Sequence, residues 1–269
     1  MTKNNHEILR AKKLILDGFY FGQRGHVPSA FSIVEILIAS YFNILNINKE
    51  NIDSNDRDIF ILSKGHGCLA LYAILMMKEI IAEEEMKNFC KFDSLLGGHP
   101  NAEDIPGVEY SSGSLGHGLS FSVGIAKALK IKNSNQKVHC LIGDGEINEG
   151  TIWEALLSMN SNKLDNLTII MDYNKVQSFG PTEEVYPLEP LKDKIEAFNC
   201  DVYEVKDVTI EKVTDVIKIE SSRPKFIICH TIKGNGIDEM EKDLSWHHRG
   251  KISEEVYKAF SSELEKRYA

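Results

Sequence analysis

Apolar and polar positions follow two different periods along the chain. Short apolar runs rich in β-branched residues, typical of buried strands, occupy residues 138–142, 167–171, 202–205 and 226–229. Stretches with helical spacing occupy residues 8–16, 32–42, 69–81, 119–130, 152–161, 210–219 and 254–267. Strands that alternate with helices predict an α/β fold, a parallel twisted sheet with helices on both faces, and we expect at least one further strand. Because no repeat or linker interrupts the pattern, we expect one domain over residues 1–269.

The clearest chemical signal lies where two predicted strands end. Gly143-Asp144-Gly145 follows the first of them, and Asp172-Tyr173-Asn174 follows the second. The residues between suffice for a crossover helix, which would place both strands side by side and Asp144 opposite Asn174 at the carboxyl edge. Open α/β sheets bind ligands at that edge, and such oxygens suit Mg²⁺ or Ca²⁺ bridged to phosphate. The pattern predicts a metal-bridged diphosphate; the alternative is a simple Asp-Gly turn with Asn174 as a helix cap.

Composition narrows the function classes. The 31 basic and 40 acidic residues give a net charge of −9, which argues against a nucleic-acid or anionic-membrane surface. The longest apolar run, residues 68–77, is too short to span a bilayer, and the amino terminus lacks the apolar core of a signal peptide. The 5 cysteines are scattered without a CxxC pair, which is typical of buried thiols in a reducing compartment. We therefore expect a cytoplasmic protein.

Five loops combine glycine with histidine. They are RGHVPS at residues 24–29, SKGHG at 63–67, GGHP at 97–100, GSLGHG at 113–118 and WHHRG at 246–250. Glycine lets the backbone approach a ligand closely, and two of these loops open a predicted helix, whose N-terminus favours an anion. One such histidine is more often a surface residue than a functional one. Five loops beside a diphosphate signal favour a ligand site, whereas His139, inside a strand, is expected to be a core residue or a residue on a face of the sheet.

These motifs together resemble one enzyme family. GDGEINEG followed by Asn174 resembles the thiamine diphosphate motif of transketolase, although the family often ends it with Asn-Asn and this chain has Tyr-Asn. The order RGHVPS, SKGHGC, GGHP, GSLGHG, GDGEINEG and SWHH is similar to the amino-terminal half of transketolase, over about residues 6–250. Residues 231–236, TIKGNG, resemble the family's TxKGxG turn. The resemblance implies the transketolase fold that binds the cofactor's diphosphate.

The resemblance also implies roles for individual residues. The divalent cation, Mg²⁺ or Ca²⁺, is expected on Asp144, Asn174 and the carbonyl of Val176. The cofactor, thiamine diphosphate, is expected to contact His66, Gly113, Ser114, Leu115, Gly143, Asp144, Gly145, Glu146, Asn174 and His247. Leu115 would touch the aminopyrimidine, unless it is a core side chain, and His248 could take the place of His247.

Four residues are expected to act in catalysis by the same resemblance. They are His26 and His99, which would face the sugar's hydroxyls and share its proton transfers, His247, and Glu149. Glu149 resembles a glutamate of the family that lies at a subunit contact and couples two active sites. The alternative is that Glu149 only favours the first turn of its helix through its charge.

The resemblance implies a partner. Transketolases of full length carry a pyrimidine-binding domain, which supplies a glutamate to the aminopyrimidine, and a carboxyl-terminal domain, and neither is recognised in this sequence. We therefore expect the amino-terminal subunit of a split transketolase, inactive alone, in a heterotetramer with two carboxyl-terminal subunits. It would move a two-carbon ketol unit from a ketose to an aldose, with sugar phosphates as substrates.

Three alternatives stay open. They are a dinucleotide oxidoreductase, the α subunit of a 2-oxo-acid dehydrogenase, and a non-catalytic assembly subunit with a thiamine fold. The first lacks the GxGxxG fingerprint after its first strand, and the second fits the GHG, GHP and GSLG loops less well.

Overall fold

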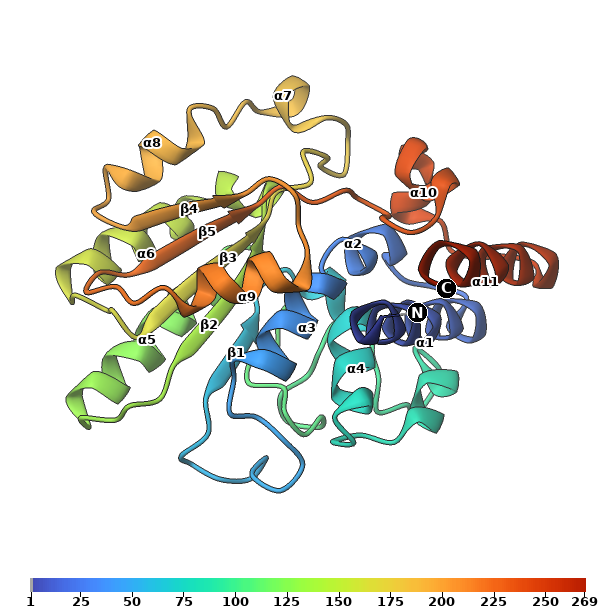
Figure 1. Ribbon diagram of the computed structural model, residues 1–269, viewed down its shortest axis with the longest axis horizontal. Helices are drawn as coiled ribbons and strands as arrows, with labels where there is room; N and C mark the ends of the chain where they lie inside the picture. Colours follow the sequence, from blue (N-terminus) through green and yellow to red (C-terminus); the bar gives the residue numbers. More distant parts are fainter. Residues whose placement is uncertain (1) are drawn as a thin grey trace.

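The computed structural model describes residues 2–269 and contains, within that range, a five-stranded sheet in the order β1-β2-β3-β5-β4. All neighbouring strands are parallel, and the sheet lies in the left half of the view in Figure 1, with α1 (Lys3–Gly22), α4 (Cys68–Met77), α10 (Asp238–Lys242) and α11 (Glu254–Tyr268) to its right. The strands are β1 (Ile59–Leu62), β2 (Val138–Gly143), β3 (Leu167–Asp172), β4 (Asp201–Val205) and β5 (Lys225–Cys229). The predicted parallel α/β fold and the four predicted strands are confirmed.

The further strand that we expected is β1, at the edge of the sheet beside β2. Its four residues, Ile59–Leu62, are buried or half-buried and follow a polar stretch that ends at Asp58. A run of this length is too short to show a period of its own, so only its pairing with Val138–Leu141 identifies it as a strand.

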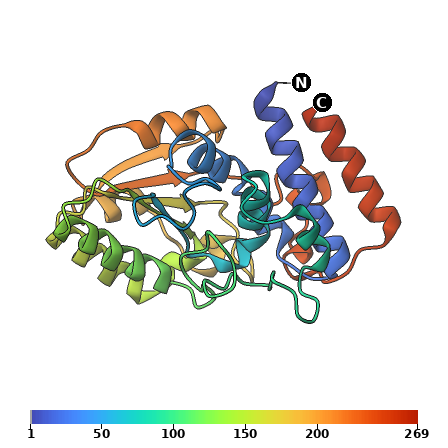
Figure 2. The ribbon, with the colours of Figure 1, turned by 90° about the horizontal axis from the view of Figure 1, so that it is seen from below.

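Helices cover both faces of the sheet (Figures 1 and 2). The α-helices are α1 (Lys3–Gly22), α2 (Val27–Phe31), α3 (Val34–Asn43), α4 (Cys68–Met77), α5 (His117–Ile131), α6 (Gly150–Ser161), α7 (Thr182–Val185), α8 (Leu191–Glu196), α9 (Ile210–Lys218), α10 (Asp238–Lys242) and α11 (Glu254–Tyr268). Short 3-10 turns are η1 (Gly65–Gly67), η2 (Glu83–Asn88), η3 (Gly145–Asn148) and η4 (Leu244–His248). Helix α3 packs with α9 on one face, and α5 packs with α6 on the other.

Most helix predictions hold, but the one over residues 69–81 was too long. Helix α4 ends at Met77, and Glu79 has the left-handed φ of 57° that ends a helix. The apolar residues Ile80 and Ile81 continue the hydrophobic pattern beyond the helix because they pack onto the core from the following turn. Hydrophobic periodicity alone therefore overestimated this helix.

Alternate residues of the strands point into two separate cores. Leu141 and Ile170 belong to the larger core, under α1, α3, α4, α9 and α11. Cys140 and Ile169, one position earlier in the same strands, belong to the second core, under α5 and α6. Since helices cover both faces of the sheet, the strand residues are apolar on both faces. This is why each strand appears in the sequence as a continuous apolar run.

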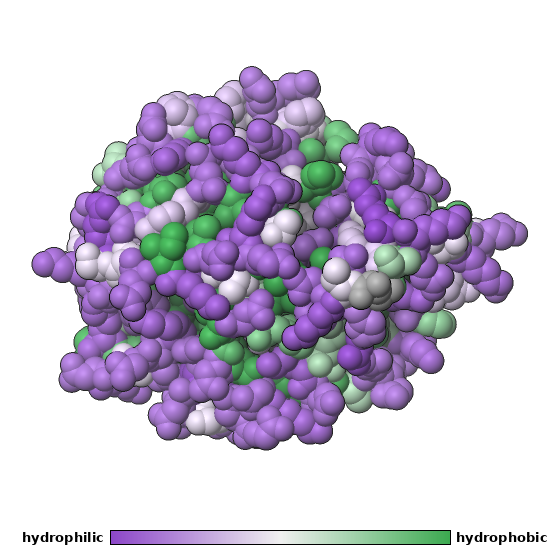
Figure 3. Space-filling model, in the orientation of Figure 1, coloured by the Kyte–Doolittle hydropathy of each residue, from purple (hydrophilic) through white to green (hydrophobic). Residues whose placement is uncertain are grey.

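The two helical faces differ in what they expose. The face that carries α9 is mainly hydrophilic, with separate small hydrophobic patches (Figure 3). On the opposite face, α5 and α6 expose Phe121, Ile131 and Leu157 at 41%, 73% and 59% of their surfaces. Within residues 2–269, no helix combines the length and the apolar character needed to cross a bilayer, and the cysteines are free thiols.

His139 is buried in the middle of the sheet, between Phe60 of β1 and Thr168 of β3. Burial lowers the pKa of His139 to about 3, and the nearby charges of Lys225 and Lys137 act in the same direction. The folded protein therefore holds this imidazole neutral, as expected for a core histidine.

Acid should destabilise the fold through His139. The unfolded chain takes up a proton on this ring below about pH 6.5, while the folded chain does not until about pH 3. The free energy of unfolding therefore decreases, through this group, as the pH falls through that window. Between pH 7 and pH 4.5, His139→Leu should lose about 2–3 kcal/mol less stability than the parent, measured by urea unfolding. The control is His6→Leu, exposed on α1, and parallel pH profiles for His139→Leu and the parent would contradict the assignment.

Candidate active site

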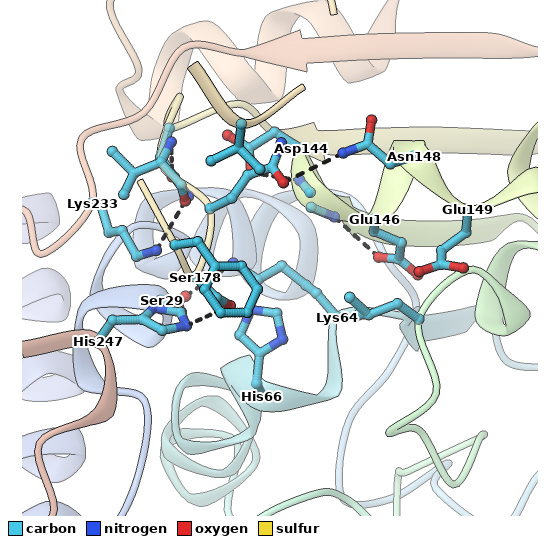
Figure 4. Close-up of a pocket in the computed structure, with 18 residues that line it drawn as sticks. Ser29, Lys64, His66, Asp144, Glu146, Asn148, Glu149, Ser178, Lys233 and His247 are labelled. Atoms are coloured by element: carbon cyan, nitrogen blue, oxygen red, sulfur yellow. Dashed lines mark hydrogen bonds between the residues drawn. The ribbon is translucent and has the colours of Figure 1, made fainter. Parts of the chain in front are cut away.

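A pocket of about 350 Å³ lies at the carboxyl edge of the sheet (Figure 4). It is formed by the loops that follow β1, β2, β3 and β5, together with residues near α2, α5 and η4. The predicted site residues that line it are His66, Leu115, Gly143, Asp144, Gly145, Glu146, Glu149, Asn174, Val176 and His247. The structure thus brings together most of the residues that the motifs singled out.

Asp144 and Asn174 lie side by side because β2 and β3 are neighbours, with Gly143 paired to Asp172. The Asp144 carboxylate accepts a hydrogen bond from the amide of Gly145 at 2.8 Å, and its other oxygen is 3.4 Å from the hydroxyl of Thr182. Burial, and then the negative charge of Asp172, raise the pKa of Asp144 to about 6. A positive charge in the pocket would therefore stabilise this carboxylate.

Asp172 is a carboxylate that the sequence interpretation missed. It is fully buried, and the ammonium of Lys64 and the hydroxyl of Thr231 donate to it, as does Ser32 at 2.8 Å. Burial alone would raise the pKa of Asp172, but Lys64 and these hydrogen bonds hold it below its usual value. Asp172 also accepts from the side-chain amide of Asn174 at 3.0 Å, which turns the amide oxygen of Asn174 away from it.

Two lysines supply positive charge to the pocket, and neither was named as a site residue beforehand. Lys64 is buried between Asp172 and the carbonyl of Ser29, to which it donates at 3.1 Å. Lys233 donates to the carbonyl of Val176 at 2.9 Å. Burial, and then the charge of Lys64, lower the pKa of Lys233 to about 8. The signal was present, since Lys64 lies in the SKGHG motif and Lys233 in the TIKGNG turn.

Three histidines from distant loops meet beside the pocket. The ring of His26 lies 5.6 Å from that of His66 and 5.3 Å from that of His247, and its Nδ1 is 3.0 Å from the carbonyl of His247. Nε2 of His247 is 3.1 Å from the hydroxyl of Ser178. Burial, and then the charge of Lys64, hold the pKa of His66 well below its usual value, so its ring is neutral. The side chain of His248, the alternative to His247, lies outside the described residues.

His99 lies apart from the pocket lining, between the SKGHG and GSLGHG loops. A Cβ at Gly65 would be 3.0 Å from the His99 ring, and one at Gly113 would be 3.8 Å from it. His99 is exposed, and burial of part of its ring lowers its pKa. The imidazole of His99 therefore lies close to both loops at positions where glycine leaves it space.

Glu146 ties three of these loops together. Its buried carboxylate accepts from the amides of Gly116 and Gly143 at 2.8 and 3.1 Å and from the hydroxyl of Ser63. Gly116 has a φ of 85°, and a Cβ there would meet Thr151 at 2.3 Å, so only glycine fits. Glu146, predicted to contact the cofactor, therefore has its oxygens engaged by the protein.

Two further residues predicted to contact the cofactor lie elsewhere in the GSLG loop. Gly113 and Ser114 are exposed and do not line the pocket, whereas Leu115 does. In the chain by itself, the GSLG loop therefore meets the pocket through Leu115.

The oxygens of this pocket suit a divalent cation. Among the side chains that the structure describes, which leave out that of His248, no cluster of three or more His, Cys, Asp or Glu residues could hold a metal. The predicted ligand set instead contains one carboxylate, one amide oxygen and one main-chain carbonyl, all hard donors that leave positions for phosphate and water. The long 3.4 Å contact leaves one Asp144 oxygen weakly engaged. These donors fit Mg²⁺ held jointly with a diphosphate.

A sequence profile described as "Transketolase, thiamine diphosphate binding domain" matches residues 4–263. The chain belongs to the transketolase family. It is 38% identical over 261 residues to an apulose-4-phosphate transketolase subunit of Phocaeicola vulgatus, covering 95% of this chain and 92% of that one. It is 36% identical to a 6-deoxy-6-sulfo-D-fructose transketolase subunit of a Clostridium species, covering 97% and 96%.

The fold agrees with this family. A transketolase from Campylobacter jejuni superposes with a TM-score of 0.88 at 27% identity, over 98% of this chain and 43% of that one. The chain thus spans less than half of that transketolase and nearly the whole of the subunits above. These matches favour a transketolase amino-terminal subunit over a dinucleotide oxidoreductase and over a dehydrogenase α subunit.

Proposed function

We propose that this chain is the diphosphate-binding subunit of a thiamine diphosphate-dependent transketolase, which acts with a separate carboxyl-terminal subunit. The observation that carries the proposal is a pocket that joins Asp144, Asn174 and the Val176 carbonyl to Lys233, His66 and His247. Oxygen donors for a cation and nitrogen donors for phosphate face the same space, which suits a cation–diphosphate pair.

The cation and Lys233 share one oxygen in this proposal. Lys233 donates to the Val176 carbonyl, the third proposed ligand of Mg²⁺. If the cation takes that carbonyl, the ammonium of Lys233 would be left to pair with a phosphate oxygen. His66 and His247 lie below Asp144 in the view of Figure 4, and they would donate to the diphosphate from there. Leu115 supplies an apolar contact for the aminopyrimidine.

The sugar is proposed to meet His26 and His99. When bound, thiamine diphosphate supplies the carbanion chemistry that breaks the carbon–carbon bond of a ketose. His26 and His99 orient the sugar's hydroxyls and exchange protons with them. The relatives described above are named for apulose-4-phosphate and for 6-deoxy-6-sulfo-D-fructose, so a ketose donor, phosphorylated or otherwise anionic, and an aldose acceptor form the substrate class for this chain.

The partner is proposed to cover the outer face of α5 and α6. This face exposes Phe121, Ile131 and Leu157, and a Cβ at Gly124 would meet nothing within 4 Å. Glu149, also exposed, lies at the junction of the pocket and α6. Exposed apolar side chains of this size on two packed helices favour a subunit contact there. We propose a cytoplasmic heterotetramer with two copies of each subunit.

The test decides whether this chain is part of an enzyme or is a non-catalytic assembly subunit. The chain, with its partner of roughly 300 residues, is titrated with thiamine diphosphate and Mg²⁺ by calorimetry and assayed for two-carbon transfer from a ketose to an aldose. An enzyme binds the cofactor and forms the lengthened aldose product. Cofactor binding without transfer, over a panel of sugar phosphates, would favour the assembly subunit.

Replacing His99 separates sugar chemistry from cofactor binding. His99→Asn should lower kcat/KM for the donor ketose by about 10²-fold, since a positioned proton-transfer group contributes at least that much. The dissociation constant of thiamine diphosphate should stay unchanged, because His99 lies outside the pocket lining. The control is His230→Asn, whose ring bonds to Glu204 away from the pocket. Equal losses of turnover and of cofactor affinity would place His99 in the cofactor site instead.

A further inference from the structure

Lys12 of α1 is a fully buried ammonium outside the pocket. Its Nζ donates to Glu35 of α3 at 3.1 Å, to the main-chain carbonyl of Asn235 at 2.8 Å and to the hydroxyl of Tyr268 at 2.7 Å. A buried charge is costly unless its hydrogen bonds are satisfied, and here three acceptors from three separate parts of the chain satisfy it. Lys12 therefore fixes those three parts relative to one another.

One of these parts is the turn that carries Lys233 into the pocket. Asn235, two residues further on, is bound twice to the buried group, through its carbonyl to Lys12 and through its side-chain amide to Glu35 at 3.3 Å. Gly236 has a φ of 121°, and a Cβ there would lie 3.3 Å from both Lys12 and Tyr268. The far side of the turn is therefore packed directly on the buried ion pair.

The near side of the same turn faces the cofactor site. The amide of Gly234 donates to the carbonyl of Pro28 at 3.0 Å, and Lys233 reaches the Val176 carbonyl (Figure 4). Since Gly234 directly precedes Asn235, whose carbonyl binds Lys12, a shift at the buried ammonium moves the lysine that would meet the diphosphate. Helices α1 and α11 run side by side (Figure 2), which brings Tyr268 to this point.

We infer that Lys12, Glu35 and Tyr268 are positioning residues for the turn of residues 231–237, and that the end of α11 thereby sets the affinity of the pocket for the cofactor's diphosphate. This inference rests on the proposed function. None of the three side chains lines the pocket, so their effect passes through the backbone of the turn. A purely structural role would instead lower the stability of the fold without changing cofactor affinity.

Tyr268→Phe tests the inference with the least disturbance. Lys12→Met would leave Glu35 buried without its cation and could prevent folding, whereas Tyr268→Phe removes one hydroxyl and keeps the ring. The matched control is Tyr257→Phe on the same helix, which removes the 2.6 Å hydrogen bond to Asp17 of α1. Both variants remove a hydrogen bond between α1 and α11, but Tyr268 bonds to the ammonium that also holds the turn, whereas Tyr257 bonds to Asp17.

Two readouts on the complex with the partner decide the outcome. In calorimetry at saturating Mg²⁺, Tyr268→Phe should raise the dissociation constant of thiamine diphosphate about fivefold, while Tyr257→Phe leaves it unchanged. In the cofactor-free complex, the amides of residues 231–237 should exchange hydrogen faster in Tyr268→Phe than in the parent, whereas Tyr257→Phe should match the parent. Equal behaviour of the two variants in both readouts would overturn the inference. A parent complex that binds no cofactor would refute the proposed function, and hydrogen exchange would still decide the role of Tyr268.

Discussion

Replacing Asp144 by alanine is expected to abolish Mg²⁺-dependent binding of thiamine diphosphate. Asp144 is the one carboxylate among the proposed cation ligands, and its loss leaves Asn174 and a carbonyl, which are neutral, to hold a doubly charged ion. The diphosphate then loses the charge that joins it to the protein. We expect the affinity to fall more than about 100-fold, measured by calorimetry on the complex at pH 8, where the carboxylate is ionised.

The matched control for this experiment is Asp207→Ala. Asp207 comes after β4 and Asp144 comes after β2. Because the strands are parallel, both carboxylates lie beyond the carboxyl ends of the strands. Asp207 is exposed and pairs with Lys212 rather than facing the pocket. Its replacement should leave cofactor affinity unchanged. Unaltered affinity in Asp144→Ala would show that the cation is held elsewhere and would refute the assignment of the GDG motif.

The purified chain alone should show no transketolase activity at saturating cofactor and Mg²⁺, and should gain activity when the carboxyl-terminal subunit is added. A carboxylate placed against the aminopyrimidine contributes about 10² to 10⁴ in rate as an acid–base group. The partner would also help to exclude water from a reactive carbanion at this pocket. The measurement is the rate of two-carbon transfer against partner concentration.

Gly124→Arg tests where the partner binds. Gly124 is exposed on α5, where a Cβ meets nothing within 4 Å, so an arginine fits the isolated fold and even favours the helix. At a subunit contact the same arginine would block association. We expect a folded chain that no longer co-elutes with the partner and gains no activity from it. Ser222→Arg, in the exposed turn before β5, serves as the control.

Activity of the chain alone would require a glutamate of its own at the aminopyrimidine. Glu35 and Glu154 are the first candidates in this sequence for such a glutamate, and their positions in the structure argue against both. Glu35 is bound to Lys12 beneath the turn, and Glu154 is exposed on α6, so neither lines the pocket. Robust activity without the partner would therefore overturn the split-subunit proposal.

The position of Asp144 beside Asn174 was predictable because it depends on signals that can be read along the sequence. Two apolar runs, a connection long enough for a helix, and parallel pairing oblige the residues after both strands to meet at one edge. The glycine and histidine loops are likewise visible in the sequence, since backbone approach to a ligand demands glycine. The fold class and most of the pocket lining follow from these signals.

The charge network under the pocket became visible only in the tertiary structure. In the sequence, Asp172 is only the last residue of a strand, yet Lys64, 108 positions away, donates to its carboxylate. Lys12 likewise donates to Tyr268, which lies 256 positions away. Glu146 reads as a ligand contact, yet Gly116 and Gly143 occupy its oxygens. Hydrophobic periodicity indicates which face of a helix or strand is buried. It does not indicate which charged residue, distant in the sequence, lies opposite that face. Since burial and neighbouring charges set each pKa and each ion pair, only the folded arrangement decides which side chains hold the turn of residues 231–237 and which face the ligand.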